Sequence, residues 1–114
     1  MTVEYLFMLK YKRYDNIDEN FLIDFDAFVD VSVKFKDRIF FYVKKKDSII
    51  AQFILEMIRK YKCEMKIMQD VNEYNILKYN LFKIFSKSYP EIVLDTDFGN
   101  MIVVEIELRN NFKK

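Results

Sequence analysis

Carboxylates and lysines are the residues of this sequence that could do chemistry. Glu64-Met65-Lys66 has the form of the Glu-x-Lys half of a metal-dependent nuclease site, in which carboxylates hold Mg²⁺ and the lysine assists the attacking water. Asp95 could supply a further carboxylate. A solvent-exposed strand face has the same short pattern, so we predict no catalytic site, no metal and no cofactor. Glu64, Lys66 and Asp95 remain the candidates if the protein is a carboxylate-metal nuclease or phosphodiesterase.

The composition closes most other routes to catalysis. The chain has no histidine, the usual general base near neutral pH and the commonest metal ligand. Its one glycine cannot build a glycine-rich phosphate loop or a dinucleotide fingerprint. Its one cysteine, Cys63, alternates with Met65 and Ile67, which predicts a buried core thiol rather than a nucleophile. The sequence therefore favours a protein that binds over an enzyme.

Charge is segregated along the chain, although the net charge is only +1. Residues 34–46 are basic and contain Phe40 and Tyr42, so this predicted hairpin could hold phosphates while its rings stack on bases. Residues 91–107 are acidic and could face a basic groove on a protein. The candidate binding residues are Phe40, Tyr42, Lys44, Lys45, Lys46, Asp95, Asp97, Glu105 and Glu107.

Six segments have the alternation, or the β-branched and aromatic composition, of strands. Two pairs of them predict hairpins, the last with its turn at 97–100. Strands 3–12 and 39–43 carry apolar side chains on both faces, so the sheet should be covered on both, by helices or by another molecule. The predicted strands are 3–12, 29–35, 39–43, 62–68, 91–96 and 101–108.

Two segments repeat their apolar residues with the period of a helix. The first is 49–61, preceded by Asp47-Ser48 as an N-cap pair, and the second runs from a capping box at Asp70 to about Ser88. Residues 14–28 have no clean period and are interpreted as a connection, with a short helical turn or strand at 20–25. Beyond the main stripe of the second helix lie Ile76, Tyr79 and Phe82, which predict that it buries a second surface.

These elements predict a single α+β domain over residues 1–114, with a polar tail at 110–114. The order β-ββ-α-β-α-ββ favours two layers, a largely antiparallel sheet of five or six strands with two helices packed on one face. One strand-helix-strand passage could give a parallel pair. No apolar run reaches the length of a membrane span, no signal peptide is visible, and a single cysteine fits a reducing compartment. We therefore expect a soluble, cytoplasmic protein without a membrane partner.

The composition also shapes the functional expectation. Phe, Tyr, Met, Ile, Asn and Lys make up more than half of the chain, which indicates an AT-rich genome such as that of a low-GC bacterium, its phage or a virus. Twelve Phe and eight Tyr exceed what so small a core easily holds, which predicts a protein-binding surface or a homodimer. We expect a small non-enzymatic protein that binds and inhibits or neutralises a host or cognate protein, of the anti-defence or immunity type. The alternatives are a nucleic-acid-binding module that uses the basic hairpin 34–46 and the carboxylate-metal hydrolase.

Overall fold

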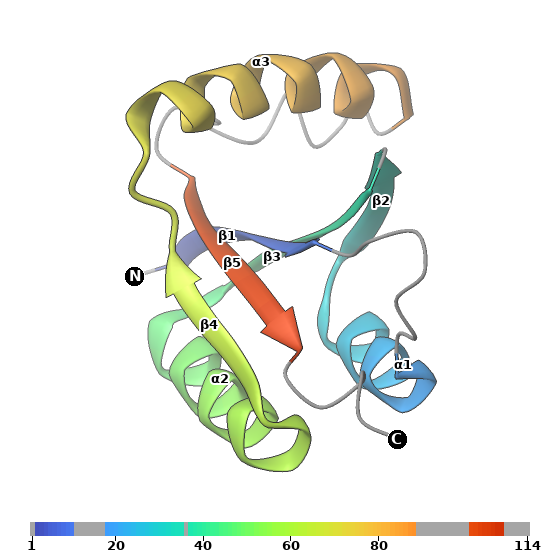
Figure 1. Cartoon of the computed structure of the whole chain (residues 1–114), viewed down its shortest axis with the longest axis vertical. Helices are drawn as coiled ribbons and strands as arrows, with labels where there is room; N and C mark the ends of the chain where they lie inside the picture. The colour runs from blue at the N-terminus through green and yellow to red at the C-terminus, as the bar shows by residue number, and fades with distance from the viewer. Residues whose placement is uncertain (1, 11–17, 36, 89–100, 109–114) are drawn as a thin grey trace.

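Five strands form one sheet in the part of the chain that the structure describes, residues 2–10, 18–35, 37–88 and 101–108 (Figure 1). The structure is a computed structural model. The strands are β1 (Thr2–Lys10), β2 (Val31–Phe35), β3 (Arg38–Lys46), β4 (Cys63–Ile67) and β5 (Ile102–Leu108). They lie in the order β2-β3-β1-β5-β4, and every neighbouring pair is antiparallel except β1 and β5.

Helices cover both faces of this sheet: α1 (Glu19–Phe28) and α2 (Asp47–Tyr61) lie on one face and α3 (Val71–Ser88) on the other (Figure 1). Asp18 caps α1 by accepting hydrogen bonds from two backbone N–H groups of its first turn. Asp70 caps α3 by accepting from the N–H of Glu73 at 2.9 Å, as the capping box predicted. The prediction that Asp47 and Ser48 cap α2 is wrong. Asp47 is the first residue of the helix, and its carboxylate accepts a hydrogen bond from the Tyr5 hydroxyl at 2.9 Å.

Packed aromatic rings form the core between the sheet and the two helices α1 and α2. Phe25 of α1 is fully buried and lies 5.4 Å from the ring centroid of Phe7 on β1, 4.9 Å from Phe41 on β3 and 5.0 Å from Phe53 on α2. Edge-to-face and tilted contacts at these distances are favourable beyond the area they bury. The side chain of Phe25 on α1 thus contacts α2 and the neighbouring strands β1 and β3.

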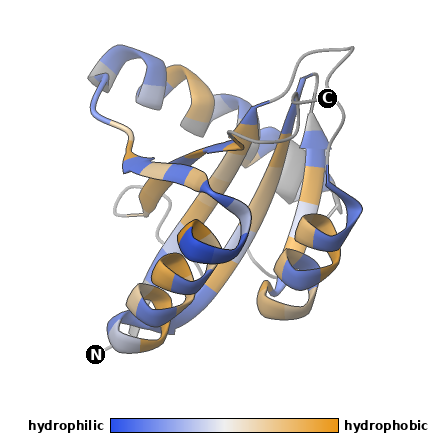
Figure 2. Ribbon diagram, turned by 60° about the horizontal axis from the view of Figure 1, so that its bottom comes forward, coloured by the Kyte–Doolittle hydropathy of each residue, from blue (hydrophilic) through white to orange (hydrophobic). Residues whose placement is uncertain are grey.

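The opposite face of the sheet has a separate and smaller core beneath α3. Leu6 and Met8 of β1 and Phe40 of β3 are buried there, and the largely hydrophobic colouring of the central strands reflects this second apolar face (Figure 2). Tyr74 and Leu77 of α3 pack against this core, and the Tyr74 hydroxyl donates to the carbonyl of Met101. Among the described side chains of α3, Tyr74 and Leu77 therefore anchor its N-terminal half to the sheet.

The α+β class and the largely antiparallel five-stranded sheet predicted from the sequence are confirmed. The single helical layer is corrected, because the strands are apolar on both faces and each face is covered by a helix. The parallel pair joins β1 and β5, the first and last strands, rather than the two ends of a strand-helix-strand passage. The predicted connection at 14–28 contains α1. The predicted strand 91–96, the turn 97–100 and the tail 110–114 lie outside the described residues.

Candidate functional site

Glu64 and Lys66, the candidates for metal chemistry, lie on β4 at one margin of the sheet. The register places Glu64 opposite Glu107 and Lys66 opposite Glu105 on β5. Asp95, the further carboxylate of the nuclease hypothesis, lies outside the described residues. Within the described ranges, no three His, Cys, Asp or Glu side chains are grouped so that they could hold a metal ion. Among the described residues, the nuclease hypothesis is therefore left with Glu64 and Lys66 on β4 and with no group that could hold a metal ion.

Glu105, one of the acidic candidates of the last strand, belongs to a mixed-charge network. The Lys10 ammonium of β1 lies 3.1 Å from a carboxylate oxygen of Glu105 and 3.7 Å from a carboxylate oxygen of Glu73 on α3. Glu107, one position further along the same face, is exposed. Asp95 and Asp97 are outside the described residues. The placed part of the predicted acidic hairpin is thus partly neutralised, which weakens its pull on a basic partner.

The basic candidates Lys44, Lys45 and Lys46 are the last three residues of β3. The Lys44 ammonium lies 3.8 Å from a carboxylate oxygen of Glu4, and that of Lys45 lies 5.3 Å from the ring centroid of Phe28. The two aromatic candidates of this hairpin, Phe40 and Tyr42, are 0% and 5% exposed in the core beneath α3. Neither ring can stack on a base in this arrangement, so the lysines would have to bind phosphates without an aromatic platform.

Cys63, the one thiol of the chain, is buried in the core between the sheet and α2. Burial raises the pKa of this thiol, because the low-dielectric surroundings disfavour the thiolate. A thiol that stays protonated at neutral pH is a poor nucleophile. The structure thus places Cys63 among the core residues, as its alternation with Met65 predicted.

The outer face of α3 carries the apolar residues that sequence analysis singled out beyond the main stripe of this helix. Ile76, Tyr79 and Phe82 are 64%, 63% and 49% exposed. Tyr79 lies on the side of α3 opposite Tyr74 and Leu77, the anchors on the sheet, and Ile76 and Phe82 lie on the two flanks next to Tyr79. The prediction that α3 buries a second surface is therefore wrong for this chain alone, because these side chains are open to solvent.

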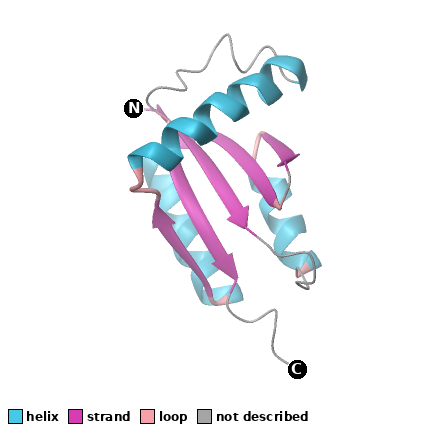
Figure 3. Ribbon diagram, turned by 45° about the horizontal axis from the view of Figure 1, so that its top comes forward, coloured by secondary structure: helices cyan, strands magenta, loops and turns pink. Residues whose placement is uncertain are grey.

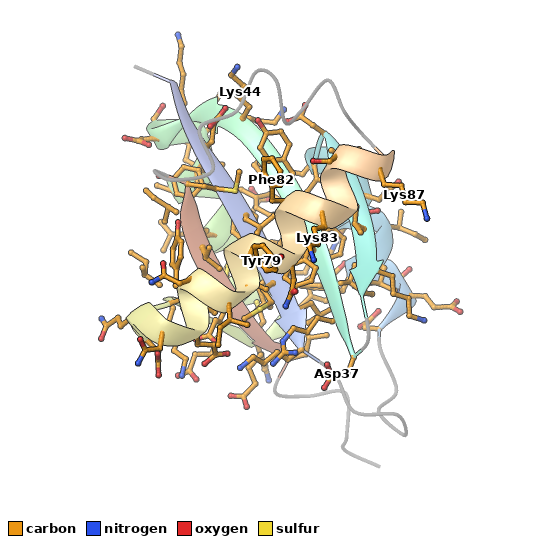
Figure 4. The ribbon with its side chains drawn as sticks, turned by 90° about the horizontal axis from the view of Figure 1, so that it is seen from above. Asp37, Lys44, Tyr79, Phe82, Lys83 and Lys87 are labelled. Carbon is orange, nitrogen blue, oxygen red and sulfur yellow. The ribbon has the colours of Figure 1, made fainter. Side chains whose placement is uncertain are left out.

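Two lysines flank this outer face, and sequence analysis had not assigned them. The Lys83 ammonium lies 4.4 Å from the ring centroid of Tyr79, and Lys87 is exposed one turn further on (Figure 4). Figure 4 looks onto this face and shows Tyr79, Phe82, Lys83 and Lys87 along the length of α3. The signal was present in the sequence, since Tyr79, Lys83 and Lys87 are spaced by four residues and so share one side of a helix.

We call this surface the α3 ridge, defined by Ile76, Tyr79, Phe82, Lys83 and Lys87.

None of the helices in the described ranges is long and apolar enough to span a bilayer. No protein-family model matches this chain, and no curated protein or solved structure matches it.

Proposed function

We propose that this protein acts by binding another protein through the α3 ridge, and that it inhibits or neutralises that partner. The observation that supports this is the exposure of three large apolar side chains in one stretch of a helix whose opposite side already packs on the sheet. Contiguous exposed apolar surface flanked by charge is typical of interaction sites. The role of α3 in the core does not explain Ile76, Tyr79 or Phe82.

The ridge suits a protein groove better than a nucleic acid. Ile76 and Phe82 offer aliphatic and aromatic surface, while the Lys83 ammonium sits over the Tyr79 ring, where a stacking base would otherwise lie. Anchors spaced at three or four positions on a helix are the usual way in which a helix docks into an apolar groove. Lys83 and Lys87 favour a groove with an acidic rim.

The composition of the chain is compatible with the proposed inhibitory or neutralising mode. It has no histidine, a single glycine and one cysteine that is buried, which leaves few groups for chemistry of its own. A small protein of this kind acts most simply by occupying a surface that its partner needs. The amino-acid composition, which is typical of an AT-rich genome, directs the search for this partner to a host of similar composition.

The experiment compares the parent with the double variant Tyr79→Ser/Phe82→Ser. Tagged protein is incubated with lysate of an AT-rich host, and the captured partner is then purified and titrated. Interface centres are dominated by a few aromatic anchors. We therefore expect the double variant to raise the dissociation constant by about 30-fold or more, from the loss of roughly 1–2 kcal/mol at each ring.

The chain offers a matched control for this experiment. Ile23 of α1 and Ile76 of α3 are the same residue type on helices and are 65% and 64% exposed. Ile76→Ser should weaken capture, while Ile23→Ser should leave it within about twofold of the parent. Equal capture by the parent and by Tyr79→Ser/Phe82→Ser would refute the proposal. So would a ligand that proves to be DNA or RNA, with affinity that falls steeply as salt rises.

A further inference from the structure

Among the described residues, β4 forms one margin of the sheet and has no strand on its outer side. Figure 3 shows β4 at one edge of the sheet, with β5 as its only neighbour among the described strands. The Met68 N–H donates to the Val103 carbonyl on β5 at 2.9 Å. Because backbone groups alternate in direction along a strand, those of Cys63, Met65 and Ile67 point the other way, out from the sheet. An edge of this kind is a template for another strand.

The sequence of β4 is complementary to itself when it is read in the opposite direction. In an antiparallel pair centred on Met65, Glu64 of one copy lies opposite Lys66 of the other, and Lys66 lies opposite Glu64. Cys63 lies opposite Ile67, so the other face of the pair is apolar. The residues with outward backbone groups, Cys63, Met65 and Ile67, pair with one another, as an antiparallel ladder requires. We propose that β4 pairs in this way with β4 of a second copy of the chain, which joins the two sheets into one.

Exposed apolar residues beside β4 support a second copy as the occupant. Ile67 is 61% exposed, and α2, which packs on β4, exposes Leu55 to 69% and Ile58 to 38%. The opposite flank of α2 contacts α1, where Phe28 and Phe53 stack at 3.7 Å. Leu55 and Ile58 are therefore on the flank that faces away from α1. A two-fold axis beside β4 brings the same flank of both copies together and covers these side chains.

The edge at the other end of the sheet lacks this complementarity. An antiparallel pair of β2 strands centred on Val33 places Ser32 opposite Lys34 and gains no pair of opposite charges. The β4 pair, by contrast, gains two Glu64–Lys66 pairs across the two-fold axis. Charge thus selects the β4 edge over the β2 edge.

Charge reversal tests both the contact and its register. Glu64→Lys gives a chain with lysine at both charged positions of β4, and Lys66→Glu gives a chain with glutamate at both. Each single variant then faces only like charges across its own two-fold axis. We expect each to dimerise at least about tenfold more weakly than the parent in light scattering or sedimentation over a micromolar concentration series.

Mixing the two single variants restores both opposite-charge pairs, so a heterodimer should form with about the parent's affinity. The double variant Glu64→Lys/Lys66→Glu should dimerise with itself for the same reason. Glu64→Lys is expected to fold, because it replaces the Glu64–Glu107 like-charge pair with an attractive one, and circular dichroism verifies this. Glu56→Lys, an exposed charge reversal on the flank of α2 turned away from β4, should leave dimerisation unchanged.

Three outcomes would overturn the proposal. The first is a parent that stays monomeric at high micromolar concentration. The second is dimerisation of the folded single variants as strong as the parent's, and the third is the absence of a heterodimer on mixing. This surface is separate from the α3 ridge, which lies on a face of the sheet rather than at its edge. A monomeric parent would therefore leave the partner-binding experiment unaffected.

Discussion

The two faces of the sheet are covered in different ways. On one face, α1 and α2 lie side by side, and the rings of Phe7, Phe21 and Phe25 between them and the sheet are fully buried. On the other face, α3 is the one described helix over the strands, and its side chains Tyr74 and Leu77 are only partly buried. Among the described side chains, the first face carries most of the aromatic packing, while the second carries the exposed ridge.

Geometry explains this difference. Neighbouring strands lie about 4.8 Å apart, so five strands span about 20 Å, while one helix with its side chains is about 10–12 Å wide. Two helices side by side can cover the full width of such a sheet, whereas one helix covers only part of it. Val31 and Val33 of β2, at the margin of the α3 face, are accordingly only partly buried. The comparison separates a face packed by two helices from a face whose single described helix leaves an apolar ridge exposed, which is the surface that the proposed function uses.

The largest test of this division is the removal of one buried ring on each face. Phe25→Ala leaves a cavity among rigid aromatic neighbours and should cost about 4–5 kcal/mol of unfolding free energy. Phe40→Ala, at an equally buried ring beneath α3, should cost about 3 kcal/mol, because a single helix can settle into the space. Guanidinium denaturation of both variants measures the difference. A cost for Phe40→Ala equal to that for Phe25→Ala would show that α3 is held as firmly as α1 and α2.

A smaller effect tests how α3 is attached to its face. The hydroxyl of Tyr74 donates to the backbone carbonyl of Met101, which joins α3 to the residue before β5. Tyr74→Phe removes this hydrogen bond and should lower the unfolding free energy by about 1 kcal/mol. Tyr79→Phe, which removes a hydroxyl from an exposed ring of the ridge, should change it by less than about 0.5 kcal/mol. Equal losses from the two variants in urea denaturation would contradict the anchoring role of Tyr74.

Much of this fold follows from local patterns in the sequence. Alternation located β1 and the β2–β3 hairpin, and helical period located α2 and α3. The helix α1 was missed because its many acidic residues hide a short apolar stripe. Two signals could have found it, the cap residue Asp18 and the spacing of Phe21, Phe25 and Phe28 at i, i+4 and i+7.

Long-range pairing was not available from local patterns. The parallel contact of β1 with β5 brings Tyr5 beside Ile102, and no periodicity within either strand specifies its partner.

The lack of long-range information in local patterns also affected the prediction of the candidate site. Phe40 and Tyr42 resemble an exposed aromatic platform in the sequence, and only the position of α3 over that face buries them. The apolar character of the second surface of α3 was predictable, because Ile76 and Tyr79 exceed what one helix stripe can bury.

The smallest expected effect concerns an ionic contact on the well-covered face. Asp24 of α1 accepts hydrogen bonds from the Lys60 ammonium at 2.8 Å and from the Tyr61 hydroxyl of α2. The hydrogen bond from Lys60 has the larger effect and that from Tyr61 the next, and both lower the pKa of the Asp24 carboxyl below its ordinary value of 3.8. The contribution to stability is therefore present above about pH 4 and is lost as the pH falls through the lowered pKa of the folded state. Asp24→Asn should melt slightly below the parent at pH 7, and the gap should close as the pH falls below that range.

Thermal melts of the parent, Asp24→Asn and Asp26→Asn measure this pH dependence. Asp26 is an exposed carboxylate on the same helix, so its replacement controls for the loss of one negative charge from α1. The gap between the parent and Asp24→Asn should exceed that for Asp26→Asn at pH 7 and should fall to the same size in acid. If the gap for Asp24→Asn were the same at both pH values, the contact between α1 and α2 would owe nothing to the ionised carboxylate. The greater stability of this face would then rest on its aromatic packing alone.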